Sequence, residues 1–343
     1  MKMTLKINLT TGLTKLNSQH KNTYMTQNVI ISTGSYLPEK ILSNDDLSKM
    51  VDTNDEWITE RTGIKNRHIA AENELTSDLA TKAAENCIEK SAINKDEIDL
   101  IIVATTTPDL TFPSTAVIVQ EKLGIKNCAA FDVQAVCSGF IYALSVADSL
   151  MKNGAAKKAL VIGAETMSRI IDWEDRSTCI LFGDGAGAVI VEQQESPQRG
   201  IFGFNLHSDN CTRQLLYTDG GVSLNGKSGF IHMEGREVFK HAVSKLAECT
   251  NEALERSNIK AEDIDLVIPH QANQRILDAT IKKLRLPNEK LYSTVKEHAN
   301  TSAASIPLAI DDAVNKGRLK QNDILALQAI GGGLTWGSVI IKF

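Results

Sequence analysis

The chain has 343 residues, of which 42% are hydrophobic and 23% are charged, and its formal net charge is -5 at pH 7. The composition is typical of a globular protein, the length fits two domains or one large duplicated domain, and the acidic balance gives no reason to expect nucleic acid as a general partner. No apolar run approaches the roughly 18 residues that a membrane-spanning helix needs, so we also expect no membrane partner.

Residues 1–24 differ in composition from the rest of the chain. They contain four lysines and no acidic residue, and they lack the continuous apolar stretch of a signal peptide. A strand pattern begins only at Val29. We therefore expect residues 1–24 to form an extension outside the fold. A transit peptide is the less favoured alternative, because this segment contains no arginine.

Helical and strand patterns alternate along the remaining chain. The periodicity predicts helices over residues 77–92, 114–124, 137–153, 238–258, 273–285 and 302–317. Strands are expected over residues 99–105, 127–133, 158–164, 186–192, 323–330 and 335–343. Such alternation indicates an α/β fold in which helices cover sheets.

One segment of the chain is repeated. Residues 93–102 align with residues 259–268, and five of the ten positions are identical. Each copy follows an amphipathic helix and ends in a polar turn, so we interpret the match as a duplication. The predicted halves are residues 25–195 and 196–343, and a site between them would collect residues from both.

The six cysteines are spread along the chain, and the closest two are nine residues apart. No pair forms Cys-x-x-Cys, so neither a zinc site nor a redox dithiol is indicated. Nothing in the sequence points to secretion, so disulfides are not expected. We predict a cytoplasmic protein with reduced cysteines and no metal.

Cys137 lies where a strand pattern gives way to a helical pattern. The unpaired N–H groups at a helix N-terminus favour a thiolate, which would make this cysteine a nucleophile. The alternative, which is more common for a single cysteine, is a small buried core residue.

At three further positions, reactive or hydrogen-bonding groups lie in predicted turns next to strands or helices. His270 directly follows a buried strand pattern, Asn300 lies in a polar turn before a helix, and residues 331–333 are three glycines between two strands. Each has a structural alternative: a packed histidine, a turn asparagine and a tight glycine turn. The glycines can also bring backbone N–H groups close to an oxyanion.

A cysteine, a histidine and an asparagine together indicate nucleophilic catalysis on an acyl group. A thiol protease uses the same residue types. However, Cys137 lies far inside a duplicated α/β chain and lacks the local protease signature. The residues alone therefore indicate acyl transfer, and they do not identify the particular reaction or its substrates.

From about Val29 to Phe343 the chain resembles β-ketoacyl-acyl-carrier-protein synthase III, a condensing enzyme of the thiolase superfamily. The motifs that carry the resemblance, in chain order, are Gly34-Ser35-Tyr36-Leu37-Pro38, Glu56-Trp57-Ile58, Arg61-Thr62-Gly63-Ile64, Cys137-Ser138-Gly139-Phe140, Phe182-Gly183-Asp184-Gly185-Ala186-Gly187, Pro269-His270-Gln271-Ala272-Asn273, Asn300-Thr301-Ser302-Ala303 and Gly331-Gly332-Gly333-Leu334-Thr335-Trp336-Gly337. The resemblance implies a thiolase-like fold with two duplicated α/β halves in α-β-α-β-α layers, and a homodimer.

The resemblance also implies the catalytic roles. Cys137 would attack acetyl-CoA and carry the acetyl group, after which His270 and Asn300 would bind the thioester carbonyl of malonyl-acyl carrier protein (malonyl-ACP) during decarboxylation. Backbone N–H groups of Cys137 and Gly332 would form the oxyanion hole. The product would be acetoacetyl-ACP, formed by ping-pong kinetics to initiate type II fatty-acid synthesis. Both thioesters are substrates, so no cofactor is expected.

Further residues match substrate-binding positions of the family. Trp57 and Arg176 match the pair that encloses the CoA adenine, and Arg61 matches a residue near the CoA phosphates. Asn273 and Phe239 match positions along the pantetheine tunnel. Phe112 matches the residue that closes the acyl pocket from the partner subunit, where a bulky ring favours a short primer.

Residues 273–290 contain five basic and two acidic residues, a local charge of +3. Arg275 and Lys282 share one face of the predicted helix, and Lys283 adjoins it. A solvated surface is the ordinary interpretation. Beside His270, and with an acidic carrier protein as partner, we expect Arg275, Lys282 and Lys283 to bind ACP.

Three other functions remain open. The first is a related condensing enzyme that loads another acyl or aroyl primer for secondary metabolism. The second is a non-catalytic homologue that only binds acyl carriers, which the intact set of Cys137, His270 and Asn300 disfavours. The third, a thiol hydrolase, is the least favoured.

Overall fold

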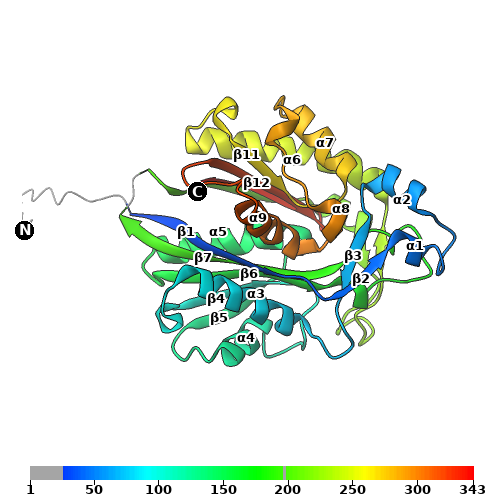
Figure 1. Cartoon of the computed structure of the whole chain (residues 1–343), viewed down its shortest axis with the longest axis horizontal. Helices are drawn as coiled ribbons and strands as arrows, with labels where there is room; N and C mark the ends of the chain where they lie inside the picture. Colours follow the sequence, from blue (N-terminus) through cyan, green and yellow to red (C-terminus); the bar gives the residue numbers. More distant parts are fainter. Residues whose placement is uncertain (1–25, 196–197) are drawn as a thin grey trace, which may run out of the picture.

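The computed structural model describes residues 26–195 and 198–343. The predicted extension, residues 1–24, lies outside the described residues. Two large sheets and three layers of helices make up most of the described fold (Figure 1). The first sheet has the strand order β1-β7-β6-β4-β5, with β1 (Thr26–Tyr36), β4 (Leu100–Ala104), β5 (Ala129–Val133), β6 (Lys158–Thr166) and β7 (Asp184–Glu195). In this sheet β4 runs parallel to β5 and β6, whereas β7 is antiparallel to both of its neighbours.

The second sheet has the strand order β11-β12-β13-β8, with β8 (Gly200–Ser208), β11 (Leu266–Pro269), β12 (Ile324–Gly331) and β13 (Thr335–Lys342). Two short pairs complete the strands: β2 (Lys40–Ser43) with β3 (Asn66–Ile69), and β9 (Leu216–Thr218) with β10 (Ile231–Met233). Strands of the first sheet thus come from residues 26–195, and those of the second from residues 200–342.

The helices form three layers around the sheets. α3 (Thr76–Ser91) and α4 (Thr115–Leu123) pack on the outer face of the first sheet, and α6 (Gly235–Ser257), with α7 (Gln274–Lys283) beside it, packs on the second. α5 (Gly139–Lys152) and α9 (Ser305–Asn315) contact strands of both sheets and form the middle layer (Figure 1). Three short helices remain: α1 (Asn44–Leu47), α2 (Asp55–Thr62) and α8 (Val295–His298). The predicted α/β fold with α-β-α-β-α layers is confirmed.

The repeated segments of the sequence fold alike. In the first half, α3 is followed by the 3₁₀ turn Lys95–Glu97 and then by β4. In the second half, α6 is followed by the 3₁₀ turn Ala261–Asp263 and then by β11. Both strands are buried and pair in parallel with a neighbour.

The middle layer is apolar on nearly every side. Phe140, Ile141 and Leu144 of α5 are fully buried in a core that includes strands of both sheets. Each such side chain contributes about 1.5–3 kcal/mol through burial. Two glycines let α9 approach the first sheet, because a Cβ atom at Gly163 or Gly187 would collide with the backbone near the start of α9. Packing thus brings the segment around residue 300 against β6.

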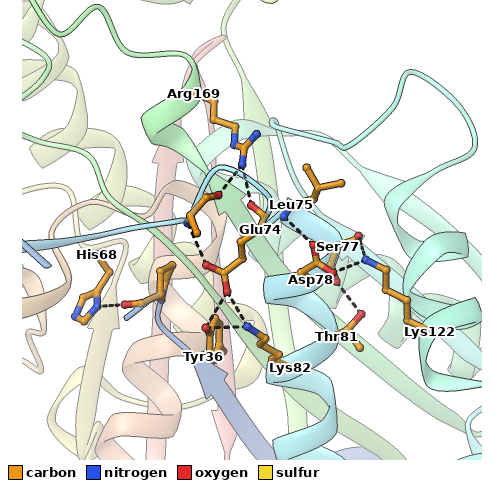
Figure 2. A network of polar contacts seen from close by, with 12 residues as sticks. Tyr36, His68, Glu74, Leu75, Ser77, Asp78, Thr81, Lys82, Lys122 and Arg169 are labelled. Atoms are coloured by element: carbon orange, nitrogen blue, oxygen red, sulfur yellow. Dashed lines mark hydrogen bonds and ion pairs between the residues drawn. The ribbon is translucent and has the colours of Figure 1, made fainter. Parts of the chain in front are cut away.

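A polar network fixes the connection between β3 and α3 (Figure 2). The Glu74 carboxylate accepts hydrogen bonds from the Tyr36 hydroxyl at 2.8 Å and the Lys82 ammonium at 2.7 Å. Arg169, which follows β6, donates to the carbonyl oxygens of Ala71, Glu72 and Glu74. These groups pair with one another, and within the described ranges no cluster of His, Cys, Asp or Glu could hold a metal ion. Likewise, none of the described helices is both long and apolar enough to span a membrane.

Candidate active site

Cys137 lies in the 3₁₀ turn Val136–Ser138, directly before α5. The Oγ atoms of Ser138 and Thr335 lie 2.7 Å apart, and each is close enough to donate to the carbonyl of Ala135. The glycine turn after β12 approaches this segment closely, since a Cβ atom at Gly331 would lie 2.6 Å from the Cys137 backbone nitrogen. The structure therefore places the nucleophile candidate against the predicted glycine turn.

Cys137 is 5% exposed, and burial raises the pKa of its thiol to about 12. A hydrogen bond with Ser302 lowers the pKa and the charge of Glu165 raises it, both more weakly. The position at the start of a helix agrees with the sequence analysis. The pKa is nevertheless raised and not lowered, because the loss of hydration outweighs the effect of the helix terminus. Attack by Cys137 thus requires its proton to be removed.

His270 follows β11 and is 3% exposed. Its Nδ1 atom lies 2.8 Å from the Ser305 hydroxyl, which also accepts a hydrogen bond from the Gln271 backbone N–H at 3.2 Å. Ser305 therefore has its own proton available for Nδ1. Burial lowers the pKa of His270 to about 3, so the ring is neutral at pH 7. A hydrogen bond with the Ser302 backbone raises the pKa more weakly. In the tautomer in which Nδ1 accepts from Ser305, the neutral ring carries its proton on Nε2 and can donate it.

Asn300 is held by both its backbone and its side chain. Its N–H donates to the carbonyl of Leu181, and its own carbonyl accepts from the N–H of Gly183 at 3.0 Å. The Oδ1 atom accepts from the Ser302 N–H at 2.9 Å. Because Oδ1 is engaged, the Nδ2 group is the free end of the amide and can donate into the neighbouring cavity.

A cavity of about 240 Å³ joins residues of both halves. Its lining includes the buried residues Cys137, His270 and Asn300 and the more exposed residues Trp57 and Arg61. The structure therefore brings the three predicted catalytic residues together in one cavity, which we call the tunnel, with Trp57 and Arg61 at its mouth. A tunnel of this kind admits a long, narrow substrate whose reactive group is at one end.

The other predicted CoA-binding residues gather at the mouth of this tunnel. The Arg61 and Arg176 guanidinium carbons lie 4.5 Å and 5.3 Å from the centre of the Trp57 ring. Asn273 lines the tunnel and also, with Phe239 and Arg61, an adjoining basic cavity of about 480 Å³. Flat cationic groups and an indole suit a heterocycle bearing phosphates.

A second cavity of about 340 Å³ opens on the other side of Cys137. Gly332 lines it together with Met167, Ile170 and Phe182, so its walls are mainly apolar. Such a space suits a short acyl group carried on the thiol. Phe112 is 83% exposed and does not line this cavity within its own chain. Its predicted contact would be with the pocket of a partner subunit.

The predicted basic helix is α7. Its apolar residues Leu277 and Ile281 are buried, as the periodicity indicates. Arg275 lies 5.8 Å from the centre of the Phe239 ring and lines the basic cavity at the tunnel mouth. Lys282 and Lys283 are exposed near the end of the helix, and Lys283 donates to Ser244.

Three polar residues at the site were missed by the sequence analysis: Glu165, Ser302 and Ser305. All are buried at the junction of β6, the turn at Ser302–Ala304 and α9. Burial raises the pKa of Glu165 to about 7. One signal was present, because Glu165 follows a predicted buried strand directly, as His270 does.

A cysteine at the start of the central helix, opposed by a histidine and an asparagine from the other half, defines a condensing enzyme of the thiolase fold. Family models for 3-oxoacyl-acyl-carrier-protein synthase III match residues 131–210, and for its C-terminal part, residues 254–343. The chain belongs to the β-ketoacyl-acyl-carrier-protein synthase III family, whose members carry out the condensing step of fatty-acid synthesis.

Relatives of this name are similar over nearly the whole chain. The protein of Wolbachia pipientis wMel is 60% identical over 320 residues, 93% of this chain and 100% of the relative. The crystal structure of the Aquifex aeolicus VF5 enzyme has a TM-score of 0.88 at 49% identity and covers 92% of this chain and 100% of that one. A priming β-ketosynthase of a polyketide biosynthetic pathway has a TM-score of 0.87 at 31% identity, covering 92% of this chain and 96% of its own.

Proposed function

We propose that this protein condenses acetyl-CoA with malonyl-ACP to give acetoacetyl-ACP, CoA and carbon dioxide, the initiating step of type II fatty-acid synthesis. The observation that carries the proposal is the tunnel with Trp57 and Arg61 at its mouth and Cys137, His270 and Asn300 at its buried end. The two thioesters are substrates, and the reaction as proposed needs no bound cofactor.

In the first half-reaction, the Cys137 sulfur attacks the acetyl thioester and CoA leaves as a thiolate. The backbone N–H groups of Cys137 and Gly332 stabilise the tetrahedral oxyanion. The acetyl group then occupies the apolar cavity next to Cys137. CoA departs before the second substrate reacts, which gives ping-pong kinetics.

In the second half-reaction, the Nε2–H of His270 and the Nδ2–H of Asn300 donate to the thioester oxygen of malonyl-ACP. As the C–CO₂ bond breaks, its electrons form an enolate, whose negative oxygen these donors stabilise. The enolate carbon attacks the acetyl thioester, and the Cys137 sulfur leaves. A low pKa suits His270 to this role, because the ring remains a neutral donor.

The substrate carriers bind outside the tunnel. Trp57 and Arg176 bind the adenine of CoA, Arg61 binds its phosphates, and Asn273 and Phe239 contact the pantetheine arm. Arg275, Lys282 and Lys283 attract the acidic carrier protein, which mainly accelerates encounter. Arg275 connects the CoA-binding residues with the ACP-binding residues, since it lines the basic cavity at the tunnel mouth.

The protein acts as a homodimer in the cytoplasm, where its cysteines remain free thiols. Phe112 supports the dimer, because a phenyl ring that is 83% exposed gains most by burial against a second chain. Placed in the partner's acyl cavity, this ring shortens the cavity and favours acetyl over longer primers.

A primer survey tests the proposed function. The purified enzyme is incubated with malonyl-ACP and a panel of acetyl, longer-chain, branched and aromatic acyl-CoAs, and the product masses are recorded. We expect acetoacetyl-ACP as the dominant product. A strong preference for branched or aromatic primers would instead support the second candidate, a primer-loading enzyme like the polyketide ketosynthase to which the chain is 31% identical.

A further inference from the structure

Glu165 lies at the carboxyl end of β6 with no exposed surface, yet it is surrounded by donors. Its Oε2 atom accepts hydrogen bonds from the backbone N–H groups of Thr106 and Thr107 and from the hydroxyls of Thr105 and Thr107, at 2.7–3.3 Å. Its Oε1 atom accepts from the Ser302 hydroxyl at 3.1 Å. The carboxylate is thus fixed, with one oxygen directed to Ser302.

Ser302 links this carboxylate to the nucleophile. Its hydroxyl hydrogen bonds with the Cys137 thiol as well as with Glu165. While Ser302 donates to Glu165, its oxygen can accept from the thiol of Cys137. Once the thiol has lost its proton, the hydroxyl can donate to the sulfur instead, which is why this hydrogen bond lowers the pKa of Cys137. A continuous chain of hydrogen bonds therefore runs from the Cys137 thiol through the Ser302 hydroxyl to the Glu165 carboxylate.

Cys137 needs such a proton acceptor, because burial makes its thiol a much weaker acid than usual. His270 is poorly suited to the task. Its Nδ1 atom contacts Ser305, the proposed decarboxylation step needs a proton on Nε2, and its pKa of about 3 makes the ring a weak base. The pKa of Glu165, about 7, is that of an effective general base at neutral pH.

Four buried titratable groups on elements packed against β6 are engaged elsewhere. Asp184 of β7 accepts from Ser168 and the Ala70 N–H, and Asp311 of α9 from Thr33, Ser35 and Lys90. Asp148 of α5 pairs with Asn28 and Lys152, and Cys87 of α3 is a buried thiol near Asp311. None of these groups contacts Ser302 in the described part of the chain.

We propose that Glu165 is the proton acceptor of acyl transfer and acts on Cys137 through the Ser302 hydroxyl. As the S–C bond forms, the thiol proton passes to Ser302 while the Ser302 proton passes to Glu165. CoA leaves as a thiolate and takes a proton from water. When condensation later expels the Cys137 thiolate, Glu165 returns its proton by the same route. The inference rests on the proposed function, since it assigns a role within the acyl-cysteine reaction.

Glu165→Gln is the most informative variant. The glutamine can place Oε1 at the position of Oε2, where it keeps the four donors, while its Nε2 group donates to Ser302. The four hydrogen bonds at Oε2 are thereby retained, but no acceptor remains for the proton. We expect single-turnover acetyl transfer at pH 7 to fall on the order of a hundredfold, the usual contribution of a general base. Ser302→Ala should show a similar loss, and Glu165→Asp a smaller one.

The pH profile distinguishes proton transfer from a structural role. In the wild type, the rate of acetyl transfer should rise with pH to a plateau with a midpoint near 7, set by ionisation of Glu165. Glu165→Asp should keep a midpoint and plateau. Glu165→Gln should lose them and rise about tenfold per pH unit up to pH 9, because hydroxide then removes the proton. Alkylation of Cys137 by iodoacetamide should follow the same profiles.

Asp311→Asn is the matched control, since it also removes a buried, hydrogen-bonded carboxylate from the middle of the fold. It should retain the wild-type pH profile. A Glu165→Gln enzyme with a rate within twofold of the wild type, or with an unchanged midpoint, would overturn the inference. If wild-type enzyme instead forms no acetyl-Cys137 at any pH, the proposed function itself fails, and the two failures are thus distinguishable.

Discussion

The Nδ1 atom of His270 and the Oγ atom of Ser305 lie 2.8 Å apart, although 35 positions separate the two residues in the chain. Ser305 is the first residue of α9, and His270 follows β11, so the contact joins the middle helical layer to the second sheet. When the Ser305 hydroxyl donates across this contact, the single proton of the neutral imidazole lies on Nε2. The decarboxylation step proposed for His270 depends on that proton.

Ser305→Ala should therefore lower the rate of malonyl-ACP decarboxylation by about tenfold, as expected for the loss of one hydrogen bond of about 1–1.5 kcal/mol. The acetyl-transfer rate should change much less, because His270 does not bind the acetyl carbonyl. Radiolabelled carbon dioxide release and acetyl-enzyme formation measure the two steps separately. Ser145→Ala, which removes a buried hydroxyl from α5 away from the site, should affect neither. Equal losses in both steps would argue against the role of Ser305 in placing the His270 proton on Nε2.

Trp57→Ala should raise KM for acetyl-CoA by about tenfold, because a desolvated stacking and cation–π surface contributes about 1–2 kcal/mol. The turnover number should remain close to that of the wild type. An acetyl thioester of pantetheine lacks the adenine nucleotide and provides the comparison. With that substrate the variant and the wild type should have the same KM; a persistent difference would place Trp57 elsewhere in the mechanism.

Lys282→Glu combined with Lys283→Glu should slow the association of malonyl-ACP by about tenfold at low ionic strength. The defect should shrink as salt is added, because salt screens exposed charges. Stopped-flow binding and KM for malonyl-ACP both measure the effect, and KM for acetyl-CoA should not change. Lys316→Glu, at the end of α9, supplies a charge reversal of the same kind on another element. A similar defect in that control would show a general effect of net charge.

Acid should destabilise the fold through His270, which is buried, and His298, which is partly buried. Burial lowers the pKa of His270 to about 3 and that of His298 to about 4, whereas an unfolded histidine titrates near 6.5. As the pH falls below about 6.5, the unfolded chain binds protons that the folded chain does not, so the free energy of unfolding decreases. Glu165 acts in the opposite direction: its pKa of about 7 exceeds the unfolded value of 4.5, so its stabilising contribution is present at low pH and is lost as the pH rises through 7.

Urea unfolding of His298→Gln at pH 7 and pH 5 isolates one of these groups. The loss of stability between the two pH values should be smaller than in the wild type by about 2 kcal/mol, the value for one proton over about 1.5 pH units. An unchanged difference would mean that His298 becomes protonated in the folded protein. Because His298 is not part of the proposed catalytic machinery, activity at pH 7 serves as a check that the variant is folded.

Much of this architecture could be predicted from the sequence, because its elements depend on local patterns. The α5 helix begins within two residues of its expected start, and the repeated segment folds twice as a helix, a turn and a strand. The edge strand β8 was not predicted, since its pairing with β13 is a long-range contact. Only the fold brings Ser302 to Glu165, across 137 positions of sequence.

The raised pKa of Cys137 also could not be predicted from its neighbours in the sequence. A helix N-terminus can be recognised from neighbouring residues, and it favours a thiolate. The burial that opposes it arises from the packing of both halves around the thiol. The same packing produces the low pKa of His270 and the near-neutral pKa of Glu165.

Mass spectrometry of the acyl-enzyme tests the central claim most directly. The wild-type protein is mixed with acetyl-CoA alone, and the intact mass and the peptide that contains Cys137 are measured. The account predicts one added acetyl group per chain, located on Cys137 and released as acetoacetyl-ACP when malonyl-ACP is added. Cys137→Ala should take up no acetyl group. Acetylation of a different residue, or acetoacetyl-ACP formation by Cys137→Ala, would contradict the account.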